Sequence, residues 1–519
     1  MKNIFQKIKE NLLVIILAAQ PFLDILAYVQ QNRDTSGAVS AAGSLAGYIR
    51  LALTLCIPLY TLFATKRKKP FIAVMAVIGV FSMLHILNSL REGTSGIFGD
   101  IKYLLLVAHM PILLFSFLFL YDKVSLKKQI TIGMISNIIV SILVFYISYA
   151  LNSGNCTYPL FQMGWTGWYV IPNAQSLVLV SLLPFAVYYM IKYCKYFFPL
   201  VAVPIVYMYT LNGTKAAFWS LVATFVGVAG FCLAEFIIAK GKLFQCYKIL
   251  MVSVLVVASL LCYKYSPRQI IDTAAEESRQ QEQNVIENLI NEDAAQKEND
   301  TDSEVESTEP DAEPGVDVES PETKPEPKPE HNKNYMYVQY INPNLIDRFG
   351  ADKVLEAYGE ENLNSYGLSD MRLKKVIFGR LTWEESDFVT KLVGFNQTKM
   401  YHNDDYFDLE NDPQAILFYY GYIGAGLYIL LLLYYVLRVI KQLIVDFKGT
   451  FNLYNFIIII TLALQIYAAT YSGYLLRRPN VSFYMMVVFL LIYCRTMPLF
   501  KKSSDNDKIA EENITDLKI

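Results

Sequence analysis

The chain has 519 residues, of which 54% are hydrophobic and 18% are charged, and its formal net charge at pH 7 is −2. A soluble domain usually has about 25% charged residues, and the mean hydropathy here is +0.32, so the composition excludes an ordinary soluble enzyme. The balanced charge offers no strongly basic surface, and we therefore expect no nucleic-acid partner.

Apolar runs of about 20 residues recur from the N-terminus onward, and a helix of that length crosses the hydrocarbon core of a bilayer. We therefore predict an all-α polytopic membrane protein with about 12 transmembrane helices and one large extracytoplasmic loop. The first run is too long for a cleavable signal peptide, and it leads straight into further spans. The predicted spans are residues 12–30, 45–64, 71–90, 102–121, 130–150, 172–191, 197–211, 216–239, 245–263, 413–437, 452–473 and 480–498.

Lysine and arginine gather in every second short connection between these spans. Because cytoplasmic loops are enriched in these residues, we predict a cell-membrane protein with both termini in the cytoplasm. Residues 1–263 then hold spans one to nine, 264–412 form an extracytoplasmic loop, 413–498 hold the last three spans, and 499–519 form a cytoplasmic tail. The basic connections are residues 2–9, 65–69, 122–128, 192–196, 240–248, 438–448 and 495–502.

The predicted outer loop divides by composition into two parts. Residues 273–334 are rich in Glu, Asp, Pro and Gln and almost lack aromatic residues, so they bury too little apolar surface to offset chain entropy, and we predict a disordered acidic tether. Contact with cations or repulsion from an anionic surface are alternative roles for it. Residues 335–412 have aromatic residues at helical spacing, which predicts a helical cap. The loop has no cysteine pair, histidine cluster or glycine-rich phosphate loop, so we expect no metal site.

Several cations break the charge rule, because they lie at the predicted outer face. They occur in tight turns marked by glycine or proline, as in "GYLLRRPNVSF" near the C-terminus. A cation at the lipid boundary usually faces a cavity or a partner, and a guanidinium fork matches phosphate oxygens, which favours a lipid-linked pyrophosphate as the ligand. Snorkelling of these side chains to lipid headgroups is the alternative. The predicted pyrophosphate-binding residues are Arg91, Lys215, Arg380, Arg477 and Arg478.

Short motifs follow one another in a fixed order along the chain. "GWTGWYVIPNAQSLVLVSLLP" leads into span six, "LNGTKAAFWSL" carries Lys215, "FGRLTW" carries Arg380, and "KLVGFN" follows it. Glu410 and an asparagine lie near the end of the loop, and after nine intervening residues the chain reads Gly421-Tyr-Ile-Gly. In this order the sequence resembles the O-antigen ligase and polymerase (Wzy-like) superfamily of membrane glycosyltransferases. It departs from the ligase pattern by having Glu410 where ligases have a proposed catalytic histidine.

The resemblance implies a GT-C-like architecture and glycosyl transfer from an undecaprenyl-pyrophosphate-linked saccharide, at the outer face of the membrane, without a metal or cofactor. A carboxylate would accept the proton of the attacking hydroxyl, and Glu410 and Asp412, just before span ten, are the predicted catalytic residues. A capping role at the start of that span, with Pro413 in its first turn, is the alternative for both. The expected partners are the lipid-linked donor, a saccharide acceptor, the lipid bilayer and other polysaccharide-assembly proteins.

Several functions remain open at this point. We predict a polymerase, for which donor and acceptor are both lipid-linked repeat units of a cell-surface polysaccharide. A ligase that moves a lipid-linked glycan onto a cell-wall or other surface acceptor uses the same chemistry. A transporter or flippase would place charged residues or broken helices near the middle of spans, whereas the cations here cluster at one face. A sensor or scaffold that binds partners through the acidic tether is the last alternative.

Overall fold

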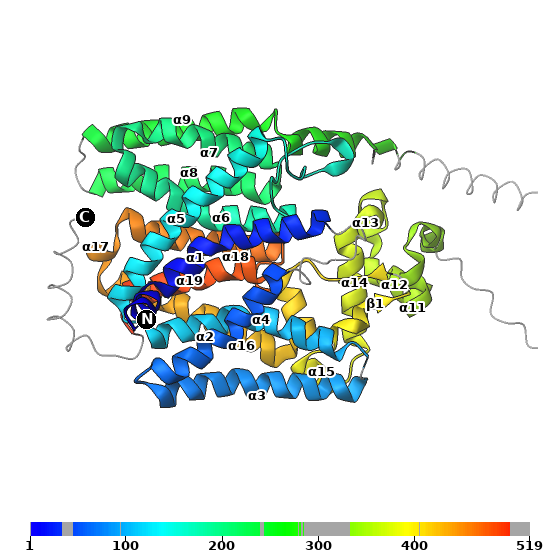
Figure 1. The fold of residues 1–519 in the computed structure, drawn as a ribbon. Coiled ribbons are helices and arrows are strands. Elements are labelled where there is room, and N and C mark those ends of the chain that lie inside the picture. The colour runs from blue at the N-terminus through cyan, green and yellow to red at the C-terminus, as the bar shows by residue number, and fades with distance from the viewer. Residues whose placement is uncertain are drawn as a thin grey trace, which may run out of the picture. The chain divides into compact units, whose positions relative to one another are not determined.

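The computed structural model of the chain is mostly helical and divides into two compact units (Figure 1). The membrane unit comprises Met1–Ile270, Asp387–Thr398 and Glu410–Ile519, and the small unit comprises Ile271–Ser386 and Lys399–Leu409. The residues that the structure describes are 2–33, 45–93, 95–238, 243–278, 280–281, 284, 333–403 and 405–498.

The membrane unit consists of long helices joined by short turns, and several of these helices begin at a polar cap. The Asp122 side chain accepts a hydrogen bond from Ser125 N at the start of α5, and the Asn452 side chain accepts one from Asn455 N at the start of α18. Such caps satisfy backbone N–H groups that have no partner within the helix. The elements are α1 (Lys2–Arg33), α2 (Leu45–Ala64), α3 (Lys68–Glu92), α4 (Ile97–Leu120), α5 (Lys123–Ala150), η1 (Pro159–Phe161), α6 (Pro172–Tyr189), η2 (Met190–Cys194), η3 (Lys195–Phe197), α7 (Phe198–Asn212), α8 (Lys215–Ile238), α9 (Leu243–Tyr263), α15 (Phe388–Val393), α16 (Asp412–Val445), α17 (Phe447–Thr450), α18 (Leu453–Tyr471) and α19 (Pro479–Arg495).

Among the described residues, ten helices are long and apolar enough to cross a membrane. One of these ten, Pro172–Asn212, is 41 residues long and contains two predicted spans, because the turns η2 and η3 separate α6 from α7. The 17-residue helix α19 corresponds to the last predicted span but is shorter than the ten. The prediction of an all-α polytopic membrane protein is therefore confirmed, whereas the count of twelve spans and the large outer loop stay predictions.

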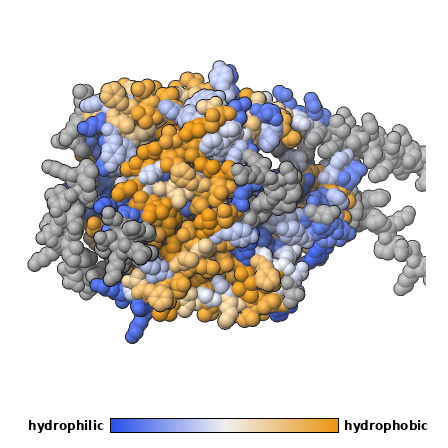
Figure 2. All heavy atoms as spheres, viewed as in Figure 1, coloured by the Kyte–Doolittle hydropathy of each residue, from blue (hydrophilic) through white to orange (hydrophobic). Residues whose placement is uncertain are grey.

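Apolar side chains fill the centre of the membrane unit and also cover its flanks. In Pro172–Asn212, 94% of the most apolar stretch is buried, against 11% in α3, so α6 lies at the centre and α3 at the periphery. Exposed Leu, Ile, Val and Phe side chains cover the outside of the peripheral helices, and Figure 2 shows a broad apolar surface over the helices of the membrane unit. An apolar outer surface is what lipid requires, because helices satisfy their own backbone groups within the hydrocarbon.

The small unit is made of short helices and one two-stranded antiparallel sheet. Its core includes three aromatic rings: the ring centroid of Phe378 lies 5.1 Å from that of Phe349 and 4.1 Å from that of Phe407. The pKa of Tyr358, which is buried in this unit, is raised to about 12 by its burial. The elements are η4 (Lys333–Tyr340), α11 (Pro343–Phe349), α12 (Ala351–Tyr358), η5 (Glu360–Asn362), α13 (Ser365–Ser369), α14 (Met371–Glu384), β1 (Tyr401–His402) and β2 (Asp405–Tyr406), with η6 (Gln397–Met400) crossing the boundary between the units.

The two units divide the loop region differently from the predicted cap of residues 335–412. Residues 387–398 and 410–412 belong to the membrane unit, because polar side chains of α3, Arg477 in the turn before α19, and backbone contacts with α16 hold them there. Most of the predicted tether, 273–334, and the whole predicted tail, 499–519, lie outside the described residues. The predicted domain limits therefore stay predictions.

Candidate functional site

The turn between α18 and α19 places two adjacent arginines in different surroundings. Its backbone is tight, because Gly473 and Tyr474 both adopt positive φ angles of 66° and 60°. Arg477 is only 2% exposed, whereas Arg478, at the N-cap of α19, is partly buried. Both guanidinium groups lie over the ring of Tyr474, at 4.6 Å for Arg477 and 4.1 Å for Arg478. The turn therefore presents one buried cation and one more accessible cation.

The buried arginine is bound to its own chain on all sides of the guanidinium. Its Nε donates to Asp412 Oδ1 at 2.9 Å, its Nη1 to the Tyr103 hydroxyl at 2.6 Å, and its Nη2 to the backbone oxygen of Glu410 at 2.9 Å. Leu476 N donates to the other carboxylate oxygen of Asp412 at 2.9 Å. Arg477 therefore joins the α18–α19 turn to the start of α16 and to α4.

The two predicted catalytic carboxylates differ in accessibility. Asp412 is fully buried, and both of its oxygens are occupied by the α18–α19 turn. Glu410 is only partly buried and lies immediately before the capping residue Asn411. A general base must reach the proton that it removes, so the geometry favours Glu410 for this role. Asp412 is instead hydrogen-bonded to Arg477 and holds that side chain in place.

Two sequence motifs that are distant in the chain meet beside these residues. Helix α16 is broken at Gly421, whose φ of 66° and ψ of −173° are not helical, and Gly394 of "KLVGFN" packs against the break. A Cβ on Gly394 would collide with the backbone of Tyr419 and Tyr420, and a Cβ on Gly421 would collide with the backbone of Leu392 and Gly394. Glycine at both positions thus permits direct contact between the two backbones.

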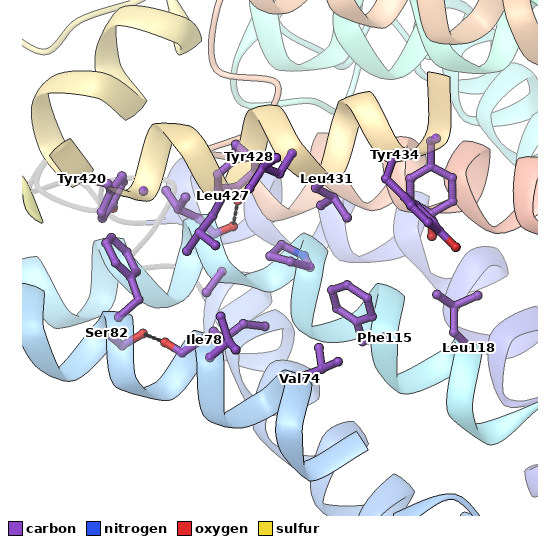
Figure 3. A pocket seen from close by; sticks show the side chains of 18 of the residues that line it. Val74, Ile78, Ser82, Phe115, Leu118, Tyr420, Leu427, Tyr428, Leu431 and Tyr434 are labelled. Atoms are coloured by element: carbon purple, nitrogen blue, oxygen red, sulfur yellow. Dashed lines mark hydrogen bonds between the residues drawn. The ribbon is translucent and has the colours of Figure 1, made fainter. Parts of the chain in front are cut away.

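An apolar groove runs along α3, α4 and α16, with a cavity volume of about 530 Å³. Figure 3 shows it extending along α16 from Tyr434 to Tyr420. Two of its polar side chains are turned to backbone oxygens, since Ser82 donates to Ile78 O at 2.8 Å and Tyr428 to Val107 O at 2.5 Å. Apart from Arg67, Ser82 and the hydroxyl groups of its tyrosines, the groove is lined by apolar side chains and aromatic rings, and it suits a long hydrocarbon chain.

One end of this groove lies next to the arginine turn. The Tyr420 ring at the groove end is stacked on Tyr103 with a centroid distance of 6.4 Å, and the Tyr103 hydroxyl is bound to Arg477. The aromatic pair therefore connects the apolar groove to the polar cluster formed by Tyr103, Glu410, Asp412, Arg477 and Arg478, here called the arginine cluster.

The other three predicted cations have different surroundings. Arg91 forms a two-point ion pair with Asp387, at 2.6 and 2.9 Å, and the Arg91 guanidinium holds the pKa of Asp387 well below its usual range. Arg380 lies in the small unit, where its Nη2 donates to the Ala357 backbone oxygen at 2.6 Å. Lys215 is exposed at the first position of α8.

The turn before Lys215 is held by the segment that leads into α6. Trp165 N donates to Leu211 O at 2.9 Å, and the Asn212 side chain donates to Gln175 Oε1 at 2.9 Å. Thr157 donates to the Asn212 backbone oxygen at 2.5 Å. The motifs "GWTGWYVIPNAQ" and "LNGTK" therefore form one packed cluster that fixes the start of α8.

Sequence reasoning missed two buried pairs of titratable side chains in the membrane unit. Arg50 Nη2 donates to Asp24 Oδ1 at 2.8 Å, and His85 Nε2 lies 3.1 Å from Asp100 Oδ2. Asp24 within the first apolar run was an available signal, because a lone carboxylate in a span needs a partner. Among the described residues, no group of three or more His, Cys, Asp or Glu side chains could hold a metal ion, and the independence from metals stays a prediction.

A comparison with protein families places the chain among known proteins. Residues 6–497 match the family described as O-antigen ligase like membrane protein. No curated protein and no solved structure matches the chain. The match covers nearly the whole sequence, including the arginine cluster and both glycine motifs. The chain therefore belongs to the O-antigen ligase-like family of membrane proteins, whose members are membrane enzymes acting on lipid-linked glycans.

Proposed function

We propose that this protein is a polymerase of undecaprenyl-pyrophosphate-linked oligosaccharide repeat units, acting at the outer face of the cell membrane. Family membership supports a glycosyltransferase that acts on lipid-linked glycans. The observation that carries the proposal is the apolar groove that ends beside the arginine cluster. A polyprenyl chain is long, flexible and apolar, so the groove suits its tail, and the cluster suits its pyrophosphate.

Arg478 is the primary pyrophosphate ligand in this proposal. Arg477 is already bound by Asp412, Tyr103 and Glu410 O, so its proposed part is to hold the turn that carries Arg478. Lys215, exposed at the fixed turn before α8, remains a further proposed ligand that lies outside the arginine cluster. Arg91 and Arg380 remain further proposed ligands, and each would have to leave a present partner, Asp387 or Ala357 O, to reach the donor.

The proposed reaction is one displacement at the sugar carbon that bears the pyrophosphate. A hydroxyl of the acceptor repeat unit attacks this carbon, and Glu410 accepts its proton. The bond between the carbon and the phosphate oxygen breaks, and its electron pair leaves with the polyprenyl pyrophosphate, where cations stabilise the charge. The products are a lipid-linked glycan longer by one donor chain and a free polyprenyl pyrophosphate, with the proton on Glu410 or passed to water.

A ligase is the second candidate, and the description of the matching family favours it. The chemistry would be the same, but the acceptor would be a cell-wall or other surface polymer. The presence of Glu410 in place of the ligase histidine favours the polymerase. The two functions therefore differ only in the acceptor, and the arginine cluster would have the same task in both.

The lipid-linked glycans of a deletion strain separate these functions. Loss of the polymerase is expected to leave single repeat units on the lipid carrier, because no unit can be joined to another. Accumulation of long lipid-linked chains would instead identify a ligase. An unchanged profile, with unchanged surface polysaccharide, would contradict both functions.

A further inference from the structure

The last turns of α3 carry a polar face directed at segment 387–398. His85, Asn88, Ser89 and Glu92 follow the spacing of one helix face, three or four residues apart. All four contact either this segment or the α4 residue Asp100 that binds it. In an otherwise lipid-facing helix such a face requires a polar partner, because unpaired polar groups are costly there.

His85 connects segment 387–398 to α4. Its Nδ1 lies 2.8 Å from the Val393 backbone oxygen, which only accepts, so Nδ1 must carry a hydrogen. Its Nε2 lies 3.1 Å from Asp100 Oδ2, which also accepts a hydrogen bond from Ser89 Oγ at 2.6 Å. The His85 side chain is fully buried between these two partners.

The rest of the polar face fixes the same segment at several further points. Asn88 Nδ2 donates to Gly394 O at 2.9 Å and lies 3.3 Å from Thr390 Oγ1. The Thr390 hydroxyl donates to Glu92 at 2.7 Å. Arg91, on the neighbouring side of the helix, binds Asp387. These contacts, with the His85–Asp100 pair, are here called the α3 clamp.

The α3 clamp holds segment 387–398 in contact with α16 at the break near Gly421. Phe395 N donates to Phe418 O at 3.3 Å, and the glycine contact at Gly394 and Gly421 brings the backbones together. The His85 ring also lies 5.2 Å from the Tyr420 ring. The clamp therefore holds the C-terminal end of the short helical piece Asp412–Tyr420, while Arg477 holds its N-terminal end through Asp412.

We propose that the α3 clamp positions Glu410, with His85 and Asn88 as positioning residues for glycosyl transfer. The inference rests on the proposed function, in which Glu410 takes the proton of the acceptor hydroxyl. A helical piece fixed at both ends is a rigid mount, and Glu410 immediately precedes it. Release of one end lets Glu410 move, and misplacement of a reacting group by about 1 Å costs on the order of 10²-fold in rate.

The first test separates turnover from donor binding. In purified protein supplied with a lipid-linked repeat unit, His85→Ala is expected to lower kcat by roughly 10- to 100-fold and to change the donor KM much less, because Arg478 lies in another turn and His85 contacts Tyr420 but does not itself line the groove. His85→Asn, whose amide nitrogen takes the place of Nδ1, keeps a donor for Val393 O and is expected to retain most of the activity. The matched control is His109→Ala, which removes another buried histidine, bonded to Thr54 at 2.6 Å, and is expected to keep kcat.

A disulfide tests whether the clamp acts only by holding the segment. All seven cysteines are free, so the variants are made in a background in which they are replaced by serine or alanine. In Asn88→Cys/Thr390→Cys the two side chains are adjacent, and oxidation replaces the clamp by a covalent bond. When His85→Ala is combined with this cysteine pair, oxidation is expected to restore the kcat that His85→Ala lost. Reduction of the disulfide is expected to lower kcat again.

The outcomes against the inference are distinct from those against the function. The positioning role would be overturned if folded His85→Ala kept the wild-type kcat, or if its loss of activity appeared in the donor KM alone. It would also be overturned if the disulfide failed to restore kcat. Absence of turnover by the wild-type protein on lipid-linked repeat units would instead count against the proposed function itself.

Discussion

At the scale of single residues, two neighbouring arginines have different surroundings and therefore different tasks. Arg477 is buried and bound by Asp412, Tyr103 and the Glu410 backbone, whereas Arg478 occupies the N-cap position of α19 and is only partly buried. Both guanidinium groups lie over the Tyr474 ring, but only that of Arg477 is buried. The pair therefore combines a structural anchor with a cation that can meet a substrate.

The anchor predicts a loss of stability. Arg477→Ala leaves the Asp412 carboxylate buried without its cation, and breaking a buried pair from one side costs roughly 3–5 kcal/mol. Unfolding of the detergent-solubilised protein should shift accordingly, and Arg477→Ala/Asp412→Ala should regain part of the loss because no lone charge stays buried. Equal stability of Arg477→Ala and Arg478→Ala would contradict the assignment of the anchor.

The accessible cation predicts a loss of donor binding. Lysine keeps the charge of Arg478 but lacks the planar fork that binds two phosphate oxygens, so Arg478→Lys should weaken donor binding or turnover markedly, and Arg478→Ala should be worse. Binding of a purified lipid-linked donor at matched protein levels measures this. Arg348→Lys, at an exposed ion pair with Glu385, is the matched control. If both Arg478 variants bound the donor like the wild type, this arginine would be a residue that contacts lipid headgroups and not a donor ligand.

At the scale of elements, the decisive feature is the break of α16 at Gly421. The break makes a short helical piece, Asp412–Tyr420, that is fixed to the α18–α19 turn at one end and to segment 387–398 at the other. The long apolar part of α16 beyond the break lines the groove. One helix thus contributes to both the polar cluster and the apolar groove.

The break predicts a position-specific effect of alanine. Gly421→Ala adds a Cβ where φ is positive and where the Leu392 and Gly394 backbone is in the way, so it should cost at least the roughly 1–3 kcal/mol of such strain. Gly426→Ala, five residues on in the same helix, meets nothing within 4 Å and should be neutral or slightly stabilising. Thermal unfolding of both variants checks this, and equal effects would speak against a strained break.

At the scale of the whole molecule, the sequence predicted the class of the protein and much of its helical plan. Apolar runs of span length were sufficient for this, because lipid permits little else but helices. The family was also recognisable from the order of the motifs, as the match over residues 6–497 confirms. The break between α6 and α7 was readable too, since "KYCKY" interrupts the apolar run.

The contacts within the site were beyond sequence reasoning, because they join residues far apart in the chain. Arg477 and Asp412 are 65 positions apart, and His85 and Val393 are 308 apart. Periodicity predicts which face of a helix is polar, but not which distant carbonyl it meets. The sequence therefore suggested Arg477 as a ligand, and only its surroundings make it an anchor.

Membrane topology gives a further prediction at this scale. The alternation of basic connections places the chain after Lys502 in the cytoplasm and residues 273–334 outside. Reporter enzymes fused at these two places should therefore read opposite sides, with the internal fusion extracytoplasmic. The reverse result for either fusion would put the arginine cluster at the cytoplasmic face and remove the outward site.

The most direct test of a polymerase with Glu410 as its base is extension of a lipid-linked repeat unit by the purified protein. The wild-type protein should convert single units into a ladder of longer lipid-linked chains and release polyprenyl pyrophosphate. Glu410→Gln keeps the size of the side chain but cannot accept a proton, so it should bind the donor and extend it about 10²- to 10⁴-fold more slowly. The account would be contradicted if the wild-type protein formed no ladder from lipid-linked units, or if Glu410→Gln extended them at the wild-type rate.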